Sequence, residues 1–390
     1  MQSSIWFATL GAAERHLVEE SDPLPASADI AIIGGGMIGL ATAHYLCEAG
    51  ATGICVIERD TLVGEASGAN AGGLWFGQQS QEMGPLSPLA RVSSRLYEEL
   101  AAQPGWNFDF RRTGLLELLF DREGLAGARA RIRAVREAGF LAEVAGREDL
   151  RKLEPSVRDA PEGAILYPDE GQLHPAKLGA AFARHLRNRN VRFSLRTEVS
   201  EVADGIVRTS SGDLRAGIIV IASGAWTPLL TCVLGYRPPI KPMRGQLLAT
   251  PPRKPFLRHT IIGRRFYYWQ LTEGHVAGGG TVEDVGFERG VCPRDLACIR
   301  DEMNTLFPDL SASPTVLSWS GFRPYCEDLR PIIGRVPGCG RIYVAAGHFK
   351  KGIMLAPVTG KILADLITTG KTDLPITSLD PARFKAHQRA

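Results

Sequence analysis

The sequence has no excess of charge of either sign, no long hydrophobic run and no closely paired cysteines. Its 45 Lys and Arg residues nearly balance 42 Asp and Glu residues, which argues against nucleic acid as a partner. No apolar run reaches the roughly 20 residues that a membrane-spanning helix needs. Residues 1–27 also lack the continuous apolar segment of a secretory signal peptide. We therefore expect a chain without a transmembrane segment that does not bind nucleic acid.

The seven cysteines are scattered along the chain, and none lies in a C-x-x-C pair. This spacing excludes a zinc knuckle and a thioredoxin-like motif. An odd number of cysteines in a long chain indicates reduced thiols, as in the cytoplasm. We accordingly expect a cytoplasmic protein without a metal site.

The composition that remains is that of a globular protein. Hydrophobic residues make up 44% and charged residues 22% of the 390 residues, which is enough apolar material for a core. At roughly 150 residues per domain, this length predicts two or three domains.

The first informative segment is a βαβ unit with a glycine-rich turn. An apolar strand over residues 29–33 leads into the G-x-G-x-x-G motif of residues 34–39. A helical segment and a second buried strand over residues 54–57 follow, and Glu58 ends that strand. This order is typical of a dinucleotide-binding site.

Each part of the motif has a physical reason. Gly34 permits the tight turn, Gly36 leaves room for a pyrophosphate, and Gly39 lets the helix pack closely on the strand. The helix N-terminus offers free N–H groups to the phosphates, and Glu58 can accept hydrogen bonds from ribose hydroxyls. The motif by itself does not distinguish NAD from FAD.

The remaining pattern predicts two sheets of different kinds. Buried strands near residues 30, 55, 220 and 343 indicate one sheet assembled from distant segments. Alternating strands near residue 115 and over residues 240–280 indicate a second, antiparallel sheet. The predicted fold class is therefore α/β (α+β, two-domain), with a Rossmann-like domain interleaved with a second domain built on a mixed or antiparallel sheet.

A long stretch of the chain carries charge of one sign. Nine basic residues and no acidic residue lie between Asp213 and Glu273. Such a stretch is typical of a surface that attracts anionic ligands. The alternative is a solvated face whose acidic partners come from elsewhere in the fold.

Six motifs beyond the glycine-rich turn carry a resemblance to a known family. They are SGANAGGL at 67–74, DEGQLHPAKL at 169–178, ASGAWTPLL at 222–230, RGQ at 244–246, SGFRPYCEDLRPIIGR at 320–335 and AAGHFKKGIMLAP at 345–357. Through them the chain resembles the D-amino-acid oxidase (DAO) superfamily of FAD-dependent oxidoreductases. The similar branch contains glycine oxidase, sarcosine oxidase-like proteins, the hydrogen cyanide synthase flavoprotein subunit, and beta subunits of proline and opine dehydrogenases.

This resemblance implies an FAD-binding domain and a substrate-binding domain, with the flavin between them. The implied FAD-binding domain covers residues 28–85, 145–232 and 325–380, the substrate-binding domain residues 86–144 and 233–324, and residues 1–27 form an N-terminal extension. We expect non-covalent FAD, because Gly321 and Phe322 occupy the region where related oxidases carry a flavin-linked cysteine. The implied cofactor-binding residues are Gly34, Gly36, Met37, Ile38, Gly39, Glu58, Arg59, Ser67, Gly68, Ala71, Gly72, Val199, Ala222, Gly224, Trp226, Gly347, Lys350, Lys351, Gly352 and Ile353.

The resemblance also implies the catalytic residues Arg323, Tyr268 and His348. Arg323 lies in the motif whose arginine pairs with a substrate carboxylate, because a guanidinium and a carboxylate form two parallel hydrogen bonds. A tyrosine donates to the same carboxylate; we favour Tyr268 over Tyr267, which lies on the opposite face of the strand. The implied reaction is hydride transfer from a small amino acid or secondary amine to FAD, after which the imine hydrolyses.

The electron acceptor and the assembly stay open at this stage. Residues 276–281 hold no lysine, whereas related oxidases use one there to activate dioxygen. Either dioxygen or an electron-transfer acceptor fits, and the latter could hold the protein at the periphery of the inner membrane. The alternative function is that of a flavoprotein subunit of a heteromeric dehydrogenase. The assembly could thus contain a second subunit, or it could be a homo-oligomer.

Overall fold

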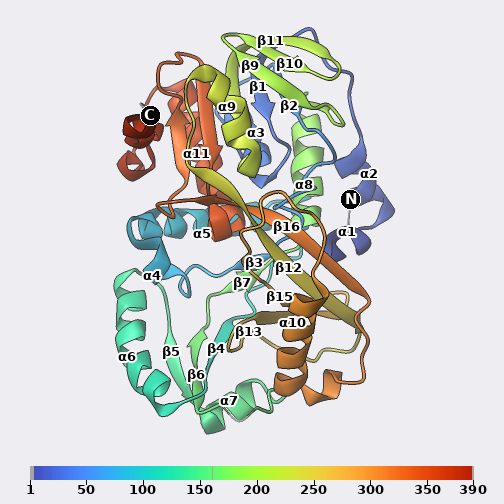
Figure 1. Ribbon diagram of the computed structural model, residues 1–390, viewed down its shortest axis with the longest axis vertical. Helices are drawn as coiled ribbons and strands as arrows, with labels where there is room; N and C mark the ends of the chain where they lie inside the picture. The colour runs from blue at the N-terminus through green and yellow to red at the C-terminus, as the bar shows by residue number, and fades with distance from the viewer. Residues whose placement is uncertain (1–3, 160, 389–390) are drawn as a thin grey trace.

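Two eight-stranded sheets organise the chain, and the computed structural model describes them within residues 4–159 and 161–388. Figure 1 shows the first sheet in the upper half of the molecule and the second sheet in the lower half. Two long strands of the second sheet, β12 (Ile240–Pro252) and β16 (Leu317–Cys326), run across the junction between the halves (Figure 1).

The first sheet joins four segments that are far apart in the sequence. Its parallel centre has the order β18-β11-β1-β2-β8, and β17 pairs with β18 in the antiparallel sense. Its strands are β1 (Ser27–Ile33), β2 (Ile54–Ile57), β8 (Arg192–Ser194), β9 (Val199–Ala203), β10 (Ile206–Thr209), β11 (Gly212–Ile221), β17 (Ile332–Arg335) and β18 (Ile342–Ala346). The sheet predicted from buried strands near residues 30, 55, 220 and 343 is confirmed.

Alternate residues of these strands enter two different cores, as the period of a strand requires. Ile30 and Ile32 pack with the helices on one face, whereas Ala31 and Ile33 pack with a second apolar cluster on the other. The helices of the first face are α3 (Met37–Glu48), α8 (Pro175–Arg187) and α11 (Gly352–Thr368), and α5 (Ser87–Ala102) packs on α11. A sheet covered on both faces explains why its strands are continuously apolar in the sequence.

The second sheet is mostly antiparallel and has the order β16-β12-β15-β14-β13-β4-β6-β5. Its other strands are β4 (Leu115–Leu119), β5 (Glu143–Gly146), β6 (Gly163–Tyr167), β13 (Thr260–Ile262), β14 (Tyr267–Gln270) and β15 (His275–Gly279). The pair β4–β13 is parallel, so the sheet is mixed. The remaining helices and strands are α4 (Ser80–Met83), α6 (Arg122–Glu137), α7 (Arg147–Leu153), α9 (Thr227–Thr231), α10 (Pro293–Leu306), β3 (Gly73–Leu74) and β7 (Gly171–Gln172).

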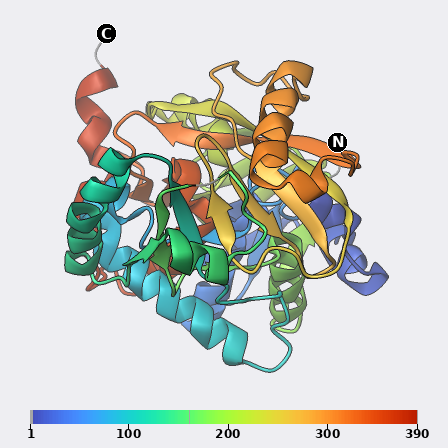
Figure 2. The same cartoon turned by 90° about the horizontal axis from the view of Figure 1, so that it is seen from below.

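Two strands of the second sheet lie on the other side of the predicted domain boundary. The sequence prediction placed residues 145–232 in the nucleotide-binding half, yet β6 pairs with β4 of the second sheet, and β5, whose last residues fall in this range, pairs with β6. Ala145 of β5 and Ala164 of β6 pack in one apolar cluster with residues of α7 and α10, which explains the placement. Viewed from below, Figure 2 shows α10 and α5 on opposite sides of this sheet.

The N-terminal extension folds onto the body as α1 (Ile5–Ala8) and α2 (Ala12–Glu19). Trp6 is buried, its indole N–H donates to the carbonyl of Asn70 over 2.6 Å, and its ring stacks near that of Trp269. Thr9 Oγ1 lies 3.0 Å from His174 Nε2. The extension therefore supports the loop that follows Ser67.

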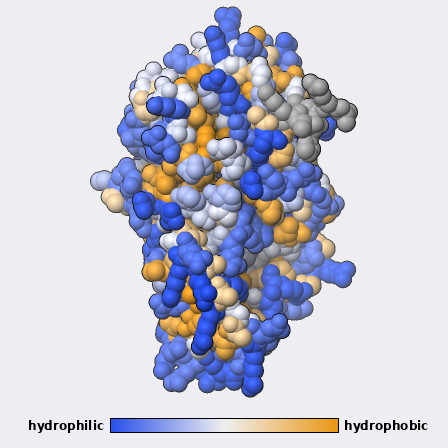
Figure 3. All heavy atoms as spheres, turned by 90° about the vertical axis from the view of Figure 1, so that its left-hand side faces the viewer, coloured by the Kyte–Doolittle hydropathy of each residue, from blue (hydrophilic) through white to orange (hydrophobic). Residues whose placement is uncertain are grey.

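Hydrophilic side chains dominate the face in Figure 3, and its hydrophobic side chains occur in small separate groups. None of the helices within the described residues combines the length and the apolar character needed to cross a bilayer.

Candidate functional site

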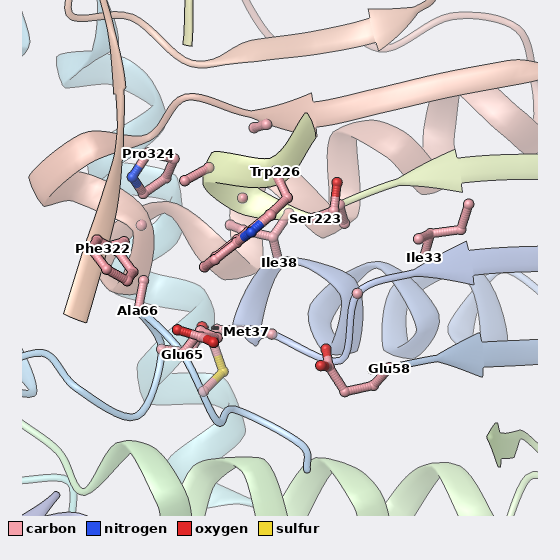
Figure 4. Close-up of a pocket in the computed structure, with 18 of the residues that line it drawn as sticks. Ile33, Met37, Ile38, Glu58, Glu65, Ala66, Ser223, Trp226, Phe322 and Pro324 are labelled. Atoms are coloured by element: carbon pink, nitrogen blue, oxygen red, sulfur yellow. Dashed lines mark hydrogen bonds between the residues drawn. The ribbon is translucent and has the colours of Figure 1, made fainter. Parts of the chain in front are cut away.

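A cleft opens at the carboxyl ends of the parallel strands β1, β2 and β11, with a volume of about 390 Å³. In such sheets this edge is where ligands bind. Trp226 projects into the middle of the cleft, with Glu58 towards one end and Phe322 and Pro324 towards the other (Figure 4). The strand-end residues Ile33, Ile57 and Ala222 give this part an apolar lining.

The glycine-rich turn shapes the floor of the cleft. Gly34 has a φ of 115°, and a Cβ atom there would lie 2.5 Å from the carbonyl oxygen of Ala222. A Cβ atom on Gly39 would clash with the carbonyl oxygen of Gly34, so this glycine permits close packing of α3 without lining the cleft. Gly36, Met37 and Ile38 line the cleft at the helix N-terminus.

Glu58 is fixed at the end of β2. Its Oε2 accepts the N–H of Gly35 over 2.8 Å, and its Oε1 accepts the N–H of Asp60 over 3.0 Å. Burial raises the pKa of its carboxyl. Arg59 stacks on the Trp226 ring at 3.7 Å and pairs with Glu65 over 2.6 Å. These groups form the polar side of the cleft.

The loop after β2 closes over the helix N-terminus. Ser67 Oγ accepts the N–H of Met37 over 2.9 Å and lines the cleft. Gly68 and Gly72 do not line it: added Cβ atoms there would meet Val63 and Leu173, respectively. Ala71 lines a second cavity instead. The predicted loop therefore supplies some residues to the cleft and others to its support.

Most of the other residues predicted to bind the cofactor line the cleft, and some do not. Val199, Gly224, Lys350, Gly352 and Ile353 line it. Gly347, which has a φ of 78°, does not line it.

The structure gives Lys351 and His348 buried positions. The Nζ of Lys351 has no hydrogen-bond partner among the described residues, and burial lowers its pKa. His348 Nε2 lies 3.0 Å from Thr359 Oγ1 inside α11, and burial lowers the pKa of the imidazole to about 3. His348 contributes to the cleft lining but its ring bonds to the helix. The catalytic role of His348 stays a prediction, and the structure adds that its Nε2 faces Thr359 within α11.

A second cavity of about 230 Å³ adjoins the cleft. Both are lined by Ala66, Asn70, Arg323, Lys350 and Ile353. The walls that belong to the second cavity alone include the side chains of Trp75, Glu82, Arg265 and Tyr267. A molecule in the second cavity could therefore contact a ligand in the cleft at this shared border.

Arg323 lies at that border without an ionic partner. Its Nη1 donates to the carbonyl oxygen of Thr281 over 2.7 Å, and no carboxylate of the described residues forms an ion pair with it. Gly245 and Gly280 make room for the guanidinium. A Cβ atom on Gly280 would lie 2.8 Å from Arg323 Nη2 and would also clash with the Tyr267 hydroxyl. The two polar groups therefore meet at one point of the cavity wall.

The structure reverses the predicted choice between the two tyrosines. Tyr268 is fully buried on the α10 side of the sheet, where its hydroxyl donates to the carbonyl of Ile299 over 3.2 Å. Tyr267 lies on the cavity side, edge-on to Trp75 with ring centroids 4.9 Å apart. The prediction of Tyr268 as a substrate contact was wrong, since adjacent residues of β14 face opposite sides of the sheet.

Acidic residues from outside the basic stretch neutralise much of it. The ion pairs join Lys241 to Asp284, Arg244 to Glu283, Arg264 to Asp159 and Arg265 to Glu302. Distant acidic partners therefore fit these four residues; Lys241, Arg264 and Arg265 are exposed, whereas Arg244 is buried. Arg265 alone among these four lines the second cavity.

Sequence reasoning missed several residues of the second cavity. Trp75, Gln78 and Gln79 follow the SGANAGGL motif of residues 67–74, and Glu82 lies on the short helix α4. Their only signal was proximity to the small-residue loop. Arg265 precedes Tyr267 by two residues, and both line the cavity. The sequence does not show which face of this segment points to the cavity.

Comparison with known proteins agrees with this geometry. A family model described as FAD dependent oxidoreductase (DAO) matches residues 29–366. The glycine oxidase of Geobacillus kaustophilus (strain HTA426) is 30% identical, over 88% of this chain and 94% of that protein. The hydrogen cyanide synthase subunit HcnC of Pseudomonas aeruginosa is 28% identical, over 93% of this chain and 97% of that protein. A crystal structure of glycine oxidase from Geobacillus kaustophilus superposes with a TM-score of 0.87 at 28% identity, covering 92% of this chain and 99% of that chain.

Proposed function

Because the chain belongs to the DAO family of FAD-dependent oxidoreductases, we propose that it oxidises the C–N bond of a small amino acid or secondary amine acid by hydride transfer. The substrate binds in the second cavity, and its carboxylate pairs with Arg323. The product is an imine that water hydrolyses to a keto acid or aldehyde and an amine.

The cleft fits FAD, the cofactor of the family. The apolar strand ends accept an adenine, and the N-terminus of α3 at Gly36–Ile38 suits a diphosphate. A side chain on Gly36 would narrow this passage, since its Cβ atom would lie 3.2 Å from Ser67 Oγ. We infer a non-covalent cofactor: Cys326 is buried, and burial raises the pKa of its thiol to about 12.

The single observation that carries the proposal is the unpaired guanidinium of Arg323 beside the Tyr267 hydroxyl. An arginine at a cavity wall without a protein carboxylate is poised to bind a ligand carboxylate through two parallel hydrogen bonds. The tyrosine hydroxyl adds a third donor to the same group. A carboxylate held there places the adjacent α-carbon at the border shared with the cleft.

The chain contributes orientation and water exclusion to the reaction. Arg323 and Tyr267 fix the α-carbon, and the α-hydrogen leaves as hydride with both electrons of the C–H bond while the nitrogen lone pair forms the C=N bond. When bound, FAD supplies the two-electron acceptor for this hydride. Trp75 in the second cavity, 7% exposed, and Ile353 at the border, 8% exposed, limit the access of water to the substrate.

The second candidate is a flavoprotein subunit of a heteromeric dehydrogenase that passes electrons to a partner. It is favoured by the 28% identity to HcnC, a protein described as a synthase subunit. It is also favoured by the lysine-free strand β15, His275–Gly279. Both candidates use the same carboxylate anchor and differ in the fate of the electrons.

Anaerobic mixing of the FAD-loaded protein with a panel of amino acids and secondary amine acids tests the proposal. Bleaching of the flavin absorbance by a carboxylate-bearing amine supports it, and rapid recovery in air identifies an oxidase. Slow recovery in air, with fast recovery on an artificial acceptor, supports the subunit alternative. If amines without a carboxylate bleach the flavin as fast as their carboxylate counterparts, the proposed anchor is wrong.

A further inference from the structure

We propose that His44, Glu48 and His185 form a binding site for a divalent cation of the zinc type, between helices α3 and α8. The site lies apart from the cleft and the second cavity, whose linings include none of the three residues. It departs from the sequence expectation of no metal site, because the second histidine comes from a distant part of the chain.

The three side chains converge from two packed helices. His44 and Glu48 lie one turn apart on the same face of α3, and His185 lies in the last turn of α8. Their candidate ligand atoms all lie within 4.8 Å of one another. The two imidazole rings have centroids 5.0 Å apart, and His185 Nε2 lies 3.6 Å from Glu48 Oε1. Binding at the roughly 2.0–2.2 Å of zinc bonds requires these atoms to draw closer by side-chain rotation.

Unpaired imidazole nitrogens are the second, independent observation. His44 is 3% exposed, and its Nδ1 has no hydrogen-bond partner among the described residues. The Nε2 of His185 is equally inaccessible and also lacks such a partner. Buried polar atoms are normally paired, so two unpaired imidazole nitrogens in one small cluster call for a ligand. A cation accepts electron pairs from both.

The donor set selects the kind of cation. Two imidazoles and one carboxylate suit Zn²⁺, whereas Mg²⁺ and Ca²⁺ prefer oxygen ligands. The rings of Trp106 and Phe182 pack edge-on against His44 at 5.2 and 5.6 Å and restrict its orientation. The side chain of Glu48 is 46% exposed, so solvent can supply a fourth ligand.

One protein group competes with the cation. Arg189 Nη2 lies 2.9 Å from Glu48 Oε1, and its side chain is 42% exposed. A cation bound by Glu48 would leave this arginine free to turn into solvent or to bind the second carboxylate oxygen. Because α3 begins at the cleft and ends at this cluster, the cation would fasten the far end of α3 to α8.

Calorimetric titration of the FAD-loaded protein with Zn²⁺ tests the site. We expect one Zn²⁺ per chain and no comparable binding of Mg²⁺. Loss of an outer-shell partner already weakens metal binding about 10–100-fold, so His185→Ala should weaken Zn²⁺ binding at least about 100-fold and Glu48→Gln about 10-fold or more. Both positions are partly exposed, and the melting temperature without metal checks that each variant is folded.

The chain offers a matched control. His16 on α2 and Glu20, the residue that follows this helix, form a His–Glu pair at the same spacing, 3.8 Å apart and without a second histidine among the described residues. The double variant His16→Ala/Glu20→Gln should bind Zn²⁺ like the wild type. The proposal is overturned if the wild type binds no Zn²⁺ in stoichiometric amount, or if folded His185→Ala binds it undiminished. In either case the cluster serves aromatic packing alone.

Discussion

The hydroxyl of Tyr267 and the guanidinium of Arg323 meet over Gly280, a residue whose missing side chain leaves both groups in place. The tyrosine comes from β14 and the arginine from β16, two strands of the second sheet that do not pair directly. Their meeting depends on β15, which ends beside Gly280 between them. Both groups line the second cavity, and Arg323 also lines the cleft.

Gly280→Ala should disable this pair without unfolding the protein. The added methyl group would displace Tyr267 or Arg323, and we expect kcat/KM to fall at least about tenfold, which corresponds to about 1.4 kcal/mol. FAD content should stay unchanged. Gly127→Ala is the control, since nothing lies within 4 Å of its added methyl group on α6. Equal kinetics for the two variants would show that Gly280 does not shape the anchor.

The two neighbouring tyrosines should respond differently to loss of their hydroxyl groups. Tyr267→Phe should raise KM for a carboxylate substrate several-fold, because a hydrogen bond to a charged group is lost. Tyr268→Phe should leave KM unchanged and lower the free energy of unfolding by about 0.5–1.5 kcal/mol, through loss of the bond to Ile299. Steady-state kinetics and urea unfolding separate the two effects, and a KM effect confined to Tyr268→Phe would contradict the assigned faces.

The N-terminal extension should stabilise the cofactor loop. Trp6→Ala removes a buried indole that donates to Asn70 and stacks near Trp269. We expect a loss of about 3–5 kcal/mol in stability, as for other large core truncations, together with faster FAD release measured by flavin fluorescence. Ala13→Ser, at an exposed position on α2, serves as the control. FAD release at the wild-type rate would show that the extension does not stabilise the cofactor loop.

Acidification should destabilise the protein in part through His348. Its pKa is lowered from 6.5 to about 3 by burial, so the unfolded state binds the proton more readily. The stabilising contribution is present above pH 6.5 and is lost as the pH falls towards 3. Between pH 7 and pH 5 the loss amounts to about 2 kcal/mol.

His348→Gln should therefore show a smaller decrease in unfolding free energy between pH 7 and pH 5 than the wild type. His174, whose pKa burial lowers to about 4, contributes equally to both proteins. Denaturant unfolding at the two pH values measures the difference. Parallel pH profiles for variant and wild type would show that His348 binds a proton as readily in the folded state as in the unfolded state.

The sequence predicts the fold well where local pattern and topology agree. Strands over residues 29–33 and 54–57, the glycine-rich turn and Glu58 are local features, and their arrangement follows from βαβ geometry. The position of β6 was not predictable in the same way, because a short apolar strand carries no sign of the sheet that it joins. Pairing with β4 and β5 is a tertiary choice.

The sequence predicted those site residues best whose role depends on the backbone. It predicted least well the direction in which side chains point. Gly34 and Gly36 line the cleft at positions where an added side chain would crowd neighbouring atoms, so the sequence motif predicts them directly. The parity of β14, which separates Tyr267 from Tyr268, depends on pairing with β13 and β15 and is invisible in a run of four aromatic residues. Likewise, the bond between His348 and Thr359 becomes visible only once α11 is folded.

Binding of a matched pair of ligands to Arg323→Ala tests the central claim most directly. The pair consists of the amine that bleaches the flavin and its carboxamide, in which the negative charge is replaced by a neutral group of similar size. We predict that the variant weakens the carboxylate at least about 30-fold, or about 2 kcal/mol, and leaves the carboxamide nearly unchanged, with FAD content as in the wild type. Equal weakening of both ligands, or of neither, would contradict a carboxylate anchor at Arg323.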